Sequence, residues 1–303
     1  MQVRKLIAHG PSSLTIALPH KWIKKHELQK GDTLNIDEDE QGLRITSSHS
    51  ERKKSLTINL KSHDWPSTVS VLTTVYRRGY SEVVVLYETS EEYQNIATVV
   101  RNLLGFAIME NKRGRCLIRS LPTELEQDFN GLFRRVFLIL LQQLDDLKEI
   151  LGDKNALKTF FHRDADLNAL VNLSIRMIAQ GYVNDRFAEL HFFHALLVLE
   201  ECGDDITRFT IELQNYSESA KLKKGVEHCS SLLRLLYESH FQKNRGIQEF
   251  FSQYYLYWPG TKKVAAPVYE FFAKETSKTF YLRSIIEKVI QLAEILLLPQ
   301  VEE

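Results

Sequence analysis

The sequence predicts a multidomain α+β protein with three parts: a small β domain over residues 1–48, a small α/β domain over 54–120 and an all-α domain over 121–303. Three observations support this division. Short alternating stretches and turn residues fill the first part, strand and helix patterns alternate in the second, and long apolar repeats at helical spacing fill the third. The polar segment 47–54 has no periodicity and is expected to be a linker.

The first part contains too little apolar sequence to fold by itself. Strands are expected over 13–18, 33–36 and 43–46, with a short helix over 20–26 after Pro19 and an acidic turn over 37–42. A unit of a few short strands and one helical turn cannot bury enough apolar surface alone. We therefore expect it to interleave with its own copy, which predicts a homodimer.

The segment from Ser12 to Leu34 resembles the swapped-hairpin DNA-binding domain of the AbrB/MazE/SpoVT family. The matching positions are Leu18, Pro19, Leu28, Gly31 and Asp32. The resemblance implies a dimer that binds DNA.

Charge in this segment agrees with that function, because residues up to Lys30 include six Lys or Arg and one acid, Glu27. A two-fold symmetric unit would place this charge twice on one face, which suits phosphate contacts. The side chains expected to contact DNA are Arg4, Lys5, His9, Lys21, Lys24 and Lys25. The alternative is a solvated helix on a hairpin that only dimerises.

The middle part has the order βαβαββ. Strands are expected over 55–60 and 82–88, helices over 66–78 and 91–104, and a hairpin over 106–120. This order predicts helices packed on a four-stranded sheet. The part contains no phosphate-binding glycine loop. The basic residues of its hairpin are interpreted as charges on an exposed edge, and the alternative is that they assist DNA binding; they are Lys112, Arg113, Arg115 and Arg119.

The third part is expected to form two three-helix bundles. Its first helix follows a capping box of Thr123 and Glu126. The further helices are expected over 155–180, 185–213, 221–242, 246–278 and 280–298.

Carboxylates interrupt the apolar stripes of the second and third of these helices. In the helix over 185–213, one arc carries Glu200 and Asp204 among the apolar residues Phe193, Leu197 and Ile211. Asp164 lies on the stripe of the preceding helix in the same way. Half-buried like charges repel each other and lose solvation, so they require a cation. A basic side chain from a neighbouring helix or a metal ion would supply it.

The neighbouring arc of the helix over 185–213 carries Glu201 and Asp205 with Arg208 nearby. This pattern is typical of a solvent-exposed helix face. We therefore expect Glu201 and Asp205 to be solvent-exposed and dispensable.

The helix over 185–213 also resembles the third helix of PhoU, the phosphate-uptake regulator, through Asp185, Glu200, Gly203 and Asp204. The segment 164–170 is similar to the D-x-x-I-D-x-L sequence of that family, with Asn168 at the position of an Asp. The resemblance implies a PhoU-like helical domain and a metal site, because PhoU proteins place metal at the matching E-x-x-x-D residues. The predicted ligands are Asp164, Asn168, Glu200 and Asp204.

Carboxylate oxygens favour a hard cation such as Mg²⁺, Mn²⁺ or Fe³⁺ over a thiolate-bound zinc, although Zn²⁺ bound by oxygen is also an option. If no metal binds, Arg163 or Arg176 is expected to supply the counter-charge.

Composition sets the remaining limits. Hydrophobic residues make up 44% of the chain and charged residues 26%, and the net charge is zero, so any basic site must be local. The isolated cysteines Cys116, Cys202 and Cys229 fit a reducing cytoplasm. No apolar run approaches the roughly 20 residues of a membrane helix, so we expect a cytoplasmic protein that is not inserted in a membrane.

These observations favour a dimeric DNA-binding transcriptional regulator. By resemblance it would act in phosphate uptake, with a helical domain that senses a signal or contacts phosphate transporter components or signalling proteins. The alternative is an adaptor that modulates a phosphate transporter without acting in transcription. A di-metal enzyme is a third hypothesis, but the paired Glu-x-x-His pattern of such enzymes is missing. No nucleophile has a base at credible spacing, so we expect no catalytic activity.

Overall fold

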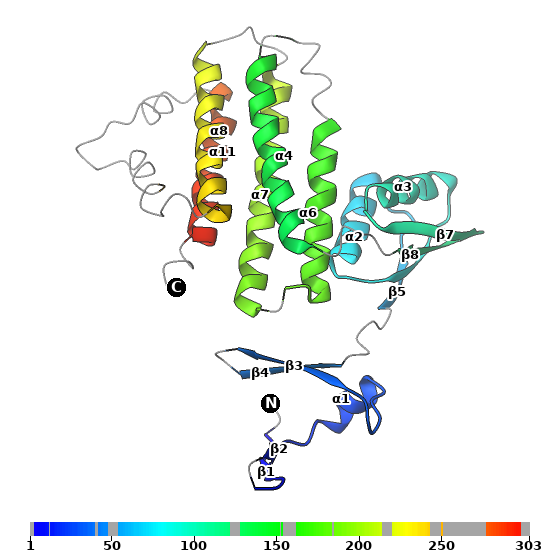
Figure 1. Cartoon of the computed structure of the whole chain (residues 1–303). Coiled ribbons are helices and arrows are strands. Elements are labelled where there is room, and N and C mark those ends of the chain that lie inside the picture. Colours follow the sequence, from blue (N-terminus) through cyan, green and yellow to red (C-terminus); the bar gives the residue numbers. More distant parts are fainter. Residues whose placement is uncertain are drawn as a thin grey trace. The chain divides into compact units, whose positions relative to one another are not determined.

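The computed structural model describes residues 3–11, 13–39, 42–47, 54–121, 128–151, 153, 162–183, 185–213, 220–242, 250 and 277–297. These residues form eight helices and eight strands, so the described fold is mixed α+β and mostly helical (Figure 1). The chain divides into two compact units, Met1–Lys54 and Ser55–Glu303.

The first unit consists of two short strand pairs and one helix. Strand β1 (Ile7–Ala8) pairs with β2 (Leu14–Thr15), and helix α1 (His20–Lys25) follows Pro19. Strand β3 (Leu34–Asp39) pairs antiparallel with β4 (Gly42–Ser47). The helix and these last two strands were predicted, but the acidic run 37–39 lies in β3. The expected turn over 37–42 is therefore too long, because pairing continues until Asp39 faces Gly42. The predicted strand over 13–18 is only two residues long.

One face of the β3–β4 ribbon is mostly apolar, although it also carries Glu38. Ile36 faces Ile45 across the pair, and Leu43 faces Glu38. Because side chains alternate between faces along a strand, Ile36, Leu43 and Ile45 share one face with Leu34. Ile36 is 60% exposed and Leu43 is 66% exposed. No side chain that the structure describes between residues 3 and 47 is buried, so the described part of this unit has no core of its own.

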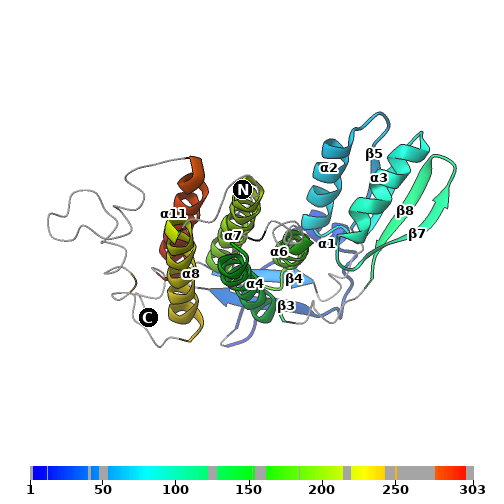
Figure 2. The same ribbon diagram turned by 90° about the horizontal axis from the view of Figure 1, so that it is seen from above.

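The second unit begins with an α/β layer in the predicted order. The elements are β5 (Ser55–Asn59), α2 (Trp65–Arg77), β6 (Glu82–Leu86), α3 (Ser90–Arg101), β7 (Phe106–Lys112) and β8 (Arg115–Ser120). The sheet order is β5-β6-β8-β7; β5 and β6 are parallel, and the other pairs are antiparallel. Helices α2 and α3 pack on each other and cover the sheet (Figure 2). The predicted four-stranded sheet with packed helices is confirmed.

Five described helices follow. They are α4 (Phe129–Ile150), α6 (His162–Gln180), α7 (Arg186–Leu213), α8 (Ala220–Phe241) and α11 (Ser277–Leu297). Helix α4 packs on α6, α7 and α8, whereas α11 packs on α7 and α8 (Figure 1). Helix α4 begins at Phe129, where the side chain of Asp128 accepts a hydrogen bond from the Gly131 amide. The predicted capping box of Thr123 and Glu126 and most of the predicted helix over 246–278 lie outside the described residues, so the two-bundle arrangement stays a prediction.

Arg176 of α6 joins the helices to the α/β layer. It is fully buried, and its Nη1 atom donates to the backbone oxygens of Tyr76 and Tyr80 at 2.9 Å each. Its guanidinium carbon also lies 4.9 Å from the centroid of the Tyr76 ring and 5.0 Å from that of Phe106. A buried guanidinium needs hydrogen bonds and ring contacts of this kind to offset its lost hydration. Arg176 therefore holds the end of α2 against α6.

No helix among the described residues is long and apolar enough to cross a membrane.

Candidate functional site

Helices α6 and α7 bring the four predicted ligand residues to one region. Gly203 makes the close approach possible, because a Cβ atom there would lie 2.2 Å from Leu167 Cδ2 and 3.5 Å from Asp164 Oδ1. Asn168 Nδ2 donates to Asp164 Oδ2 at 3.0 Å. Burial raises the pKa of Asp164, and the negative charges of Asp204 and Glu200 raise it further, while the hydrogen bond from Asn168 opposes them.

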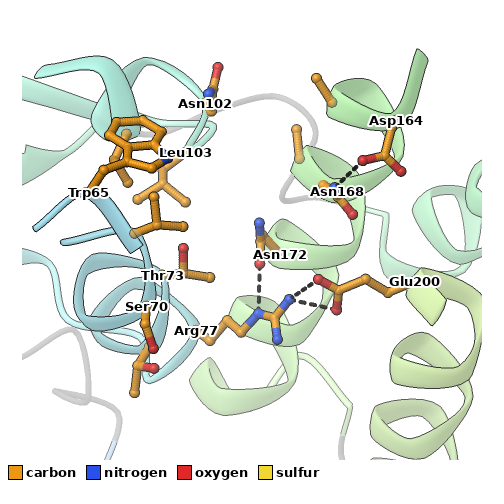
Figure 3. Close-up of a pocket in the computed structure, with 15 residues that line it drawn as sticks. Trp65, Ser70, Thr73, Arg77, Asn102, Leu103, Asp164, Asn168, Asn172 and Glu200 are labelled. Atoms are coloured by element: carbon orange, nitrogen blue, oxygen red, sulfur yellow. Dashed lines mark hydrogen bonds and ion pairs between the residues drawn. The ribbon is translucent and has the colours of Figure 1, made fainter. Parts of the chain in front are cut away.

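Arg77 of α2 supplies the counter-charge for Glu200. Its Nη2 atom lies 2.7 Å from both carboxylate oxygens of Glu200, and its Nε donates to Asn172 Oδ1 at 2.6 Å (Figure 3). A basic residue from a neighbouring helix was one of the two predicted solutions, but of the two expected residues Arg176 does not supply it. Arg176 instead donates hydrogen bonds to the backbone of the α/β layer. The side chain of Arg163 lies outside the described residues.

Asp204 also has a guanidinium partner. Arg208 Nη2 lies 2.9 Å from its Oδ2, one helical turn further along α7. Among the residues that the structure describes, no three carboxylate, imidazole or thiolate groups cluster as metal ligands would. Since Glu200 and Asp204 are each paired with an arginine, their carboxylates do not fit a metal site in this arrangement. The metal ion stays a prediction, and no chemistry is derived from it.

Asp205 corrects the predicted assignment of the two arcs. It is 3% exposed, whereas Glu201 has a side chain that is 64% exposed, as predicted. Asp205 forms an ion pair with Lys288 of α11 and lies 3.3 Å from Arg208 Nη1. Conversely, Phe193 and Ile211 are exposed on the arc that was expected to be apolar and covered. The error arises because α11 packs against α7 on the side of Asp205 and brings a lysine with it.

A pocket of about 520 Å³ opens between α2 and α3 of the α/β layer and α6 and α7 of the helical part. Its polar side carries Asp164, Asn168, Asn172 and the Arg77–Glu200 pair, and its apolar side includes Trp65 and Leu103 (Figure 3). Two oxygens among these residues, Asp164 Oδ1 and Asn168 Oδ1, are shielded from solvent. Asp164 Oδ1 faces Gly203 of α7, and a hydrogen bond from the Thr207 side chain also lowers the pKa of Asp164.

The residues predicted to contact DNA lie on the surface of the first unit. Arg4 and Lys5 precede β1, His9 follows it, and the other three are on α1. All six residues are exposed: Arg4, Lys5, His9, Lys21, Lys24 and Lys25. Helix α1 also holds Trp22 and His26 together, with ring centroids 4.7 Å apart. Cations on the surface of one small unit are able to reach phosphate groups.

Sequence reasoning missed Arg77, Asn172, Lys288 and Trp65. Arg77 closes a contact with Glu200 across 123 positions, and Lys288 closes one with Asp205 across 83. Neither Arg77 nor Lys288 departs from the ordinary pattern of a helix surface, so the local sequence carries no signal for these pairs.

The chain matches no protein-family model, no curated protein and no solved structure.

Proposed function

We propose that this protein is a dimeric DNA-binding regulator, in which residues 1–48 form the dimer and contact DNA. The helical domain would carry the regulatory input. By the resemblance of its second and third helices to PhoU, the regulated process is phosphate uptake, and the input comes from phosphate transporter components or from signalling proteins.

The observation that carries this proposal is the exposed apolar face of the β3–β4 ribbon. Ile36 and Leu43 lie in the open on a unit whose described side chains are all exposed or half-buried. Burying one such side chain is worth about 1.5–3 kcal/mol. If the ribbon of a second copy packed against this face, the apolar faces of both ribbons would be buried. This arrangement agrees with the swapped-hairpin resemblance.

The charges of the unit support DNA as the ligand of such a dimer. Lys21, Lys24 and Lys25 belong to the six-residue helix α1, and Arg4 and Lys5 precede the first strand. A dimer would carry each of these cations twice. Phosphate neutralisation by lysine and arginine dominates the affinity of proteins for DNA.

Binding of a fluorescent duplex as a function of salt tests the proposal. The logarithm of the association constant should fall linearly with the logarithm of salt concentration. The double variant Lys21→Ala/Lys24→Ala should flatten this slope by about 0.9 for each phosphate that the protein no longer neutralises. The matched control is Arg101→Ala/Arg135→Ala, which removes two exposed cations from the second unit. Equal slopes for both double variants, or no binding by the unmodified protein, would contradict DNA binding through α1.

A second candidate function is the adaptor, with the first unit serving dimerisation only. Phe187, Leu190 and Phe193 on the N-terminal half of α7 are exposed, and exposed apolar side chains of this kind favour a protein partner. A dimer that shows no salt-dependent binding to any duplex would support this candidate over the regulator.

A further inference from the structure

The pocket between α2, α3, α6 and α7 is used by neither DNA binding nor dimerisation. It lies within the second unit, and residues from both the α/β layer and the helical part line it. A volume of about 520 Å³ is in the range of small-molecule sites. The groups of its wall that are still able to form hydrogen bonds decide what kind of molecule fits.

The charged groups of the pocket already have protein partners. Arg77 donates from Nη2 to both oxygens of Glu200 and from Nε to Asn172 Oδ1. Asp164 accepts a hydrogen bond from Asn168 on one oxygen, and its other oxygen is shielded from solvent. A charged ligand would have to break one of these pairs, which is costly in a half-buried place. The pocket therefore favours a neutral molecule.

Asn172 supplies an open donor to the pocket. The residue is only 8% exposed. Because its Oδ1 accepts from Arg77, the amide nitrogen is the atom that points away from the arginine, and Figure 3 shows it on that side. Nδ2 has no hydrogen-bond partner among the described residues, and it is not shielded from solvent as Asp164 Oδ1 is. An open amide donor at a buried residue requires an acceptor, which a ligand would provide.

Thr73 of α2 supplies a second neutral group. It lines the same pocket and is half-buried. Figure 3 shows Thr73 and Asn172 on facing walls, between the guanidinium of Arg77 and the ring of Trp65. No hydrogen bond joins the Thr73 hydroxyl to another of the residues that the structure describes. A hydroxyl donates as well as accepts, so a ligand that offers a donor beside its acceptor would bind both side chains.

The wall above these two side chains is apolar. It is formed by Trp65, Val69, Val99 and Leu103. The indole of Trp65 is open to the pocket, since this residue is 44% exposed. Flat aromatic rings pack well on an indole. The apolar wall therefore favours a ligand with an aromatic body.

We propose that this pocket binds a small neutral carboxamide carried on an aromatic ring. The carbonyl oxygen of the ligand accepts from Asn172 Nδ2, its N–H group donates to Thr73 Oγ1, and its ring packs against Trp65 and Leu103. This site is independent of the proposed DNA-binding function, because none of its residues belongs to the first unit.

Four probes that share a phenyl ring test this chemistry on the full-length protein: benzamide, acetophenone, benzoate and benzylamine, each titrated by ligand-observed NMR. Benzamide should bind with a dissociation constant on the order of 1 mM. Acetophenone keeps the carbonyl group but has a methyl group in place of the amide nitrogen, so it should bind about tenfold more weakly. Benzoate and benzylamine should also bind about tenfold more weakly than benzamide, because each carries a charge.

Variants locate the site. Thr73→Val removes the hydroxyl but keeps the shape of the side chain, so it should weaken benzamide binding about tenfold and leave acetophenone unchanged. Asn172→Asp keeps an acceptor for Arg77 but replaces the open donor by a carboxylate oxygen. It should weaken benzamide binding about tenfold and strengthen that of benzylamine. The matched controls are Thr98→Val and Asn95→Asp on α3, which lie outside the pocket and should leave all four probes unchanged.

The proposal has clear contrary results. Benzamide that does not bind, or binds no more tightly than benzoate or benzylamine, would overturn it. Equal binding of benzamide and acetophenone, or equal effects of Thr73→Val and Thr98→Val, would do the same. If Asn172→Asp does not fold, the Thr73→Val comparison still decides, because Thr73 is on the surface of α2 that faces the pocket.

Discussion

The two compact units of this chain use their apolar residues differently. In Ser55–Glu303, buried side chains from the sheet and from all the long helices join one hydrophobic core, and Tyr76 and Phe137 are fully enclosed in it. In Met1–Lys54, Ile36 and Leu43 lie in the open, and no described side chain is buried. We therefore expect the second unit to be stable by itself and the first to depend on a partner. A substitution should therefore change the free energy of unfolding of the second unit only if it alters the packing or the ion pairs of that unit.

The largest effect is expected at the buried pair between α7 and α11. Asp205→Ala leaves Lys288 without its closest carboxylate, in a place where the lysine side chain is only 16% exposed. The unfolding free energy should fall by about 3 kcal/mol, the lower end for a broken buried pair, because the carbonyl oxygen of Glu201 stays 3.4 Å from Lys288 Nζ. Urea unfolding followed by helical circular dichroism measures it.

Glu201→Ala is the control for that variant, since Glu201 is exposed and lies 3.8 Å from the same lysine. It should change the unfolding free energy by less than about 0.5 kcal/mol. Equal decreases in the two variants would mean that Asp205 is not buried against α11.

A smaller effect is expected where α6 and α7 approach most closely. Gly203→Ala places a methyl group 2.2 Å from the buried Leu167 Cδ2. Overpacking of this kind costs about 1–3 kcal/mol, and the better helix propensity of alanine returns about 1 kcal/mol. The variant should therefore be less stable than the unmodified protein by about 1 kcal/mol.

The same change should reverse sign when the clash is removed. In a Leu167→Ala background, Gly203→Ala should stabilise the protein, because only the propensity gain of about 1 kcal/mol is left. Destabilisation of equal size in both backgrounds would show that Leu167 does not limit the approach of the two helices.

Glu92 of the α/β layer should give a pH-dependent effect. Its carboxylate accepts hydrogen bonds from the backbone amides of Glu88, Thr89 and Ser62, and these bonds lower its pKa from the ordinary 4.5. A lowered folded-state pKa gives stability that is present above pH 4.5 and disappears as the pH falls through the folded-state value.

Glu92→Gln should therefore destabilise the protein at neutral pH, and the difference from the unmodified protein should shrink in acid. Melting temperatures measured from pH 7 down to the acid limit of solubility check this. Glu91→Gln, an exposed neighbour in the first turn of α3, should show a pH-independent and much smaller difference. A constant difference for Glu92→Gln would mean that its charge is not involved.

Substitutions in the first unit should have the smallest effect on the free energy of unfolding of the second unit. Ile36→Asp and Leu43→Asp change exposed residues of the β3–β4 ribbon, so the free energy of unfolding of the helical part should stay within about 0.5 kcal/mol. A larger shift would show that the two units share their stability.

Local patterns predicted much of the fold. The βαβαββ order of the α/β layer, helix α1 after Pro19 and helix α7 over Arg186–Leu213 all follow from periodicity and turn residues in nearby sequence. These local patterns did not predict which residues from distant parts of the sequence form ion pairs. The side of α7 that carries Asp205 is covered by α11 with Lys288, and Glu200 is neutralised by Arg77 from another layer. A helical wheel shows which residues share a face of one helix, but it does not show what packs against that face.

The residues of the candidate site were also predicted only where local sequence patterns carry the information. The sequence placed Asp164, Asn168, Glu200 and Asp204 on neighbouring helices, and the structure brings Asp164, Asn168 and Glu200 to one pocket. The opposite wall with Trp65 and the ion pair with Arg77 depend on how the α/β layer docks on α6. That docking is a tertiary contact without a local signature.

The molar mass in solution tests the central claim most directly. Light scattering after size-exclusion chromatography, at micromolar concentration, should give the full-length chain twice its mass of 35.2 kDa. A chain that begins at Lys54 should elute as a folded monomer, and Ile36→Asp/Leu43→Asp should reduce the full-length protein to a monomer. A full-length chain that is monomeric at this concentration, or a dimer that survives removal of the residues before Lys54, would contradict the account.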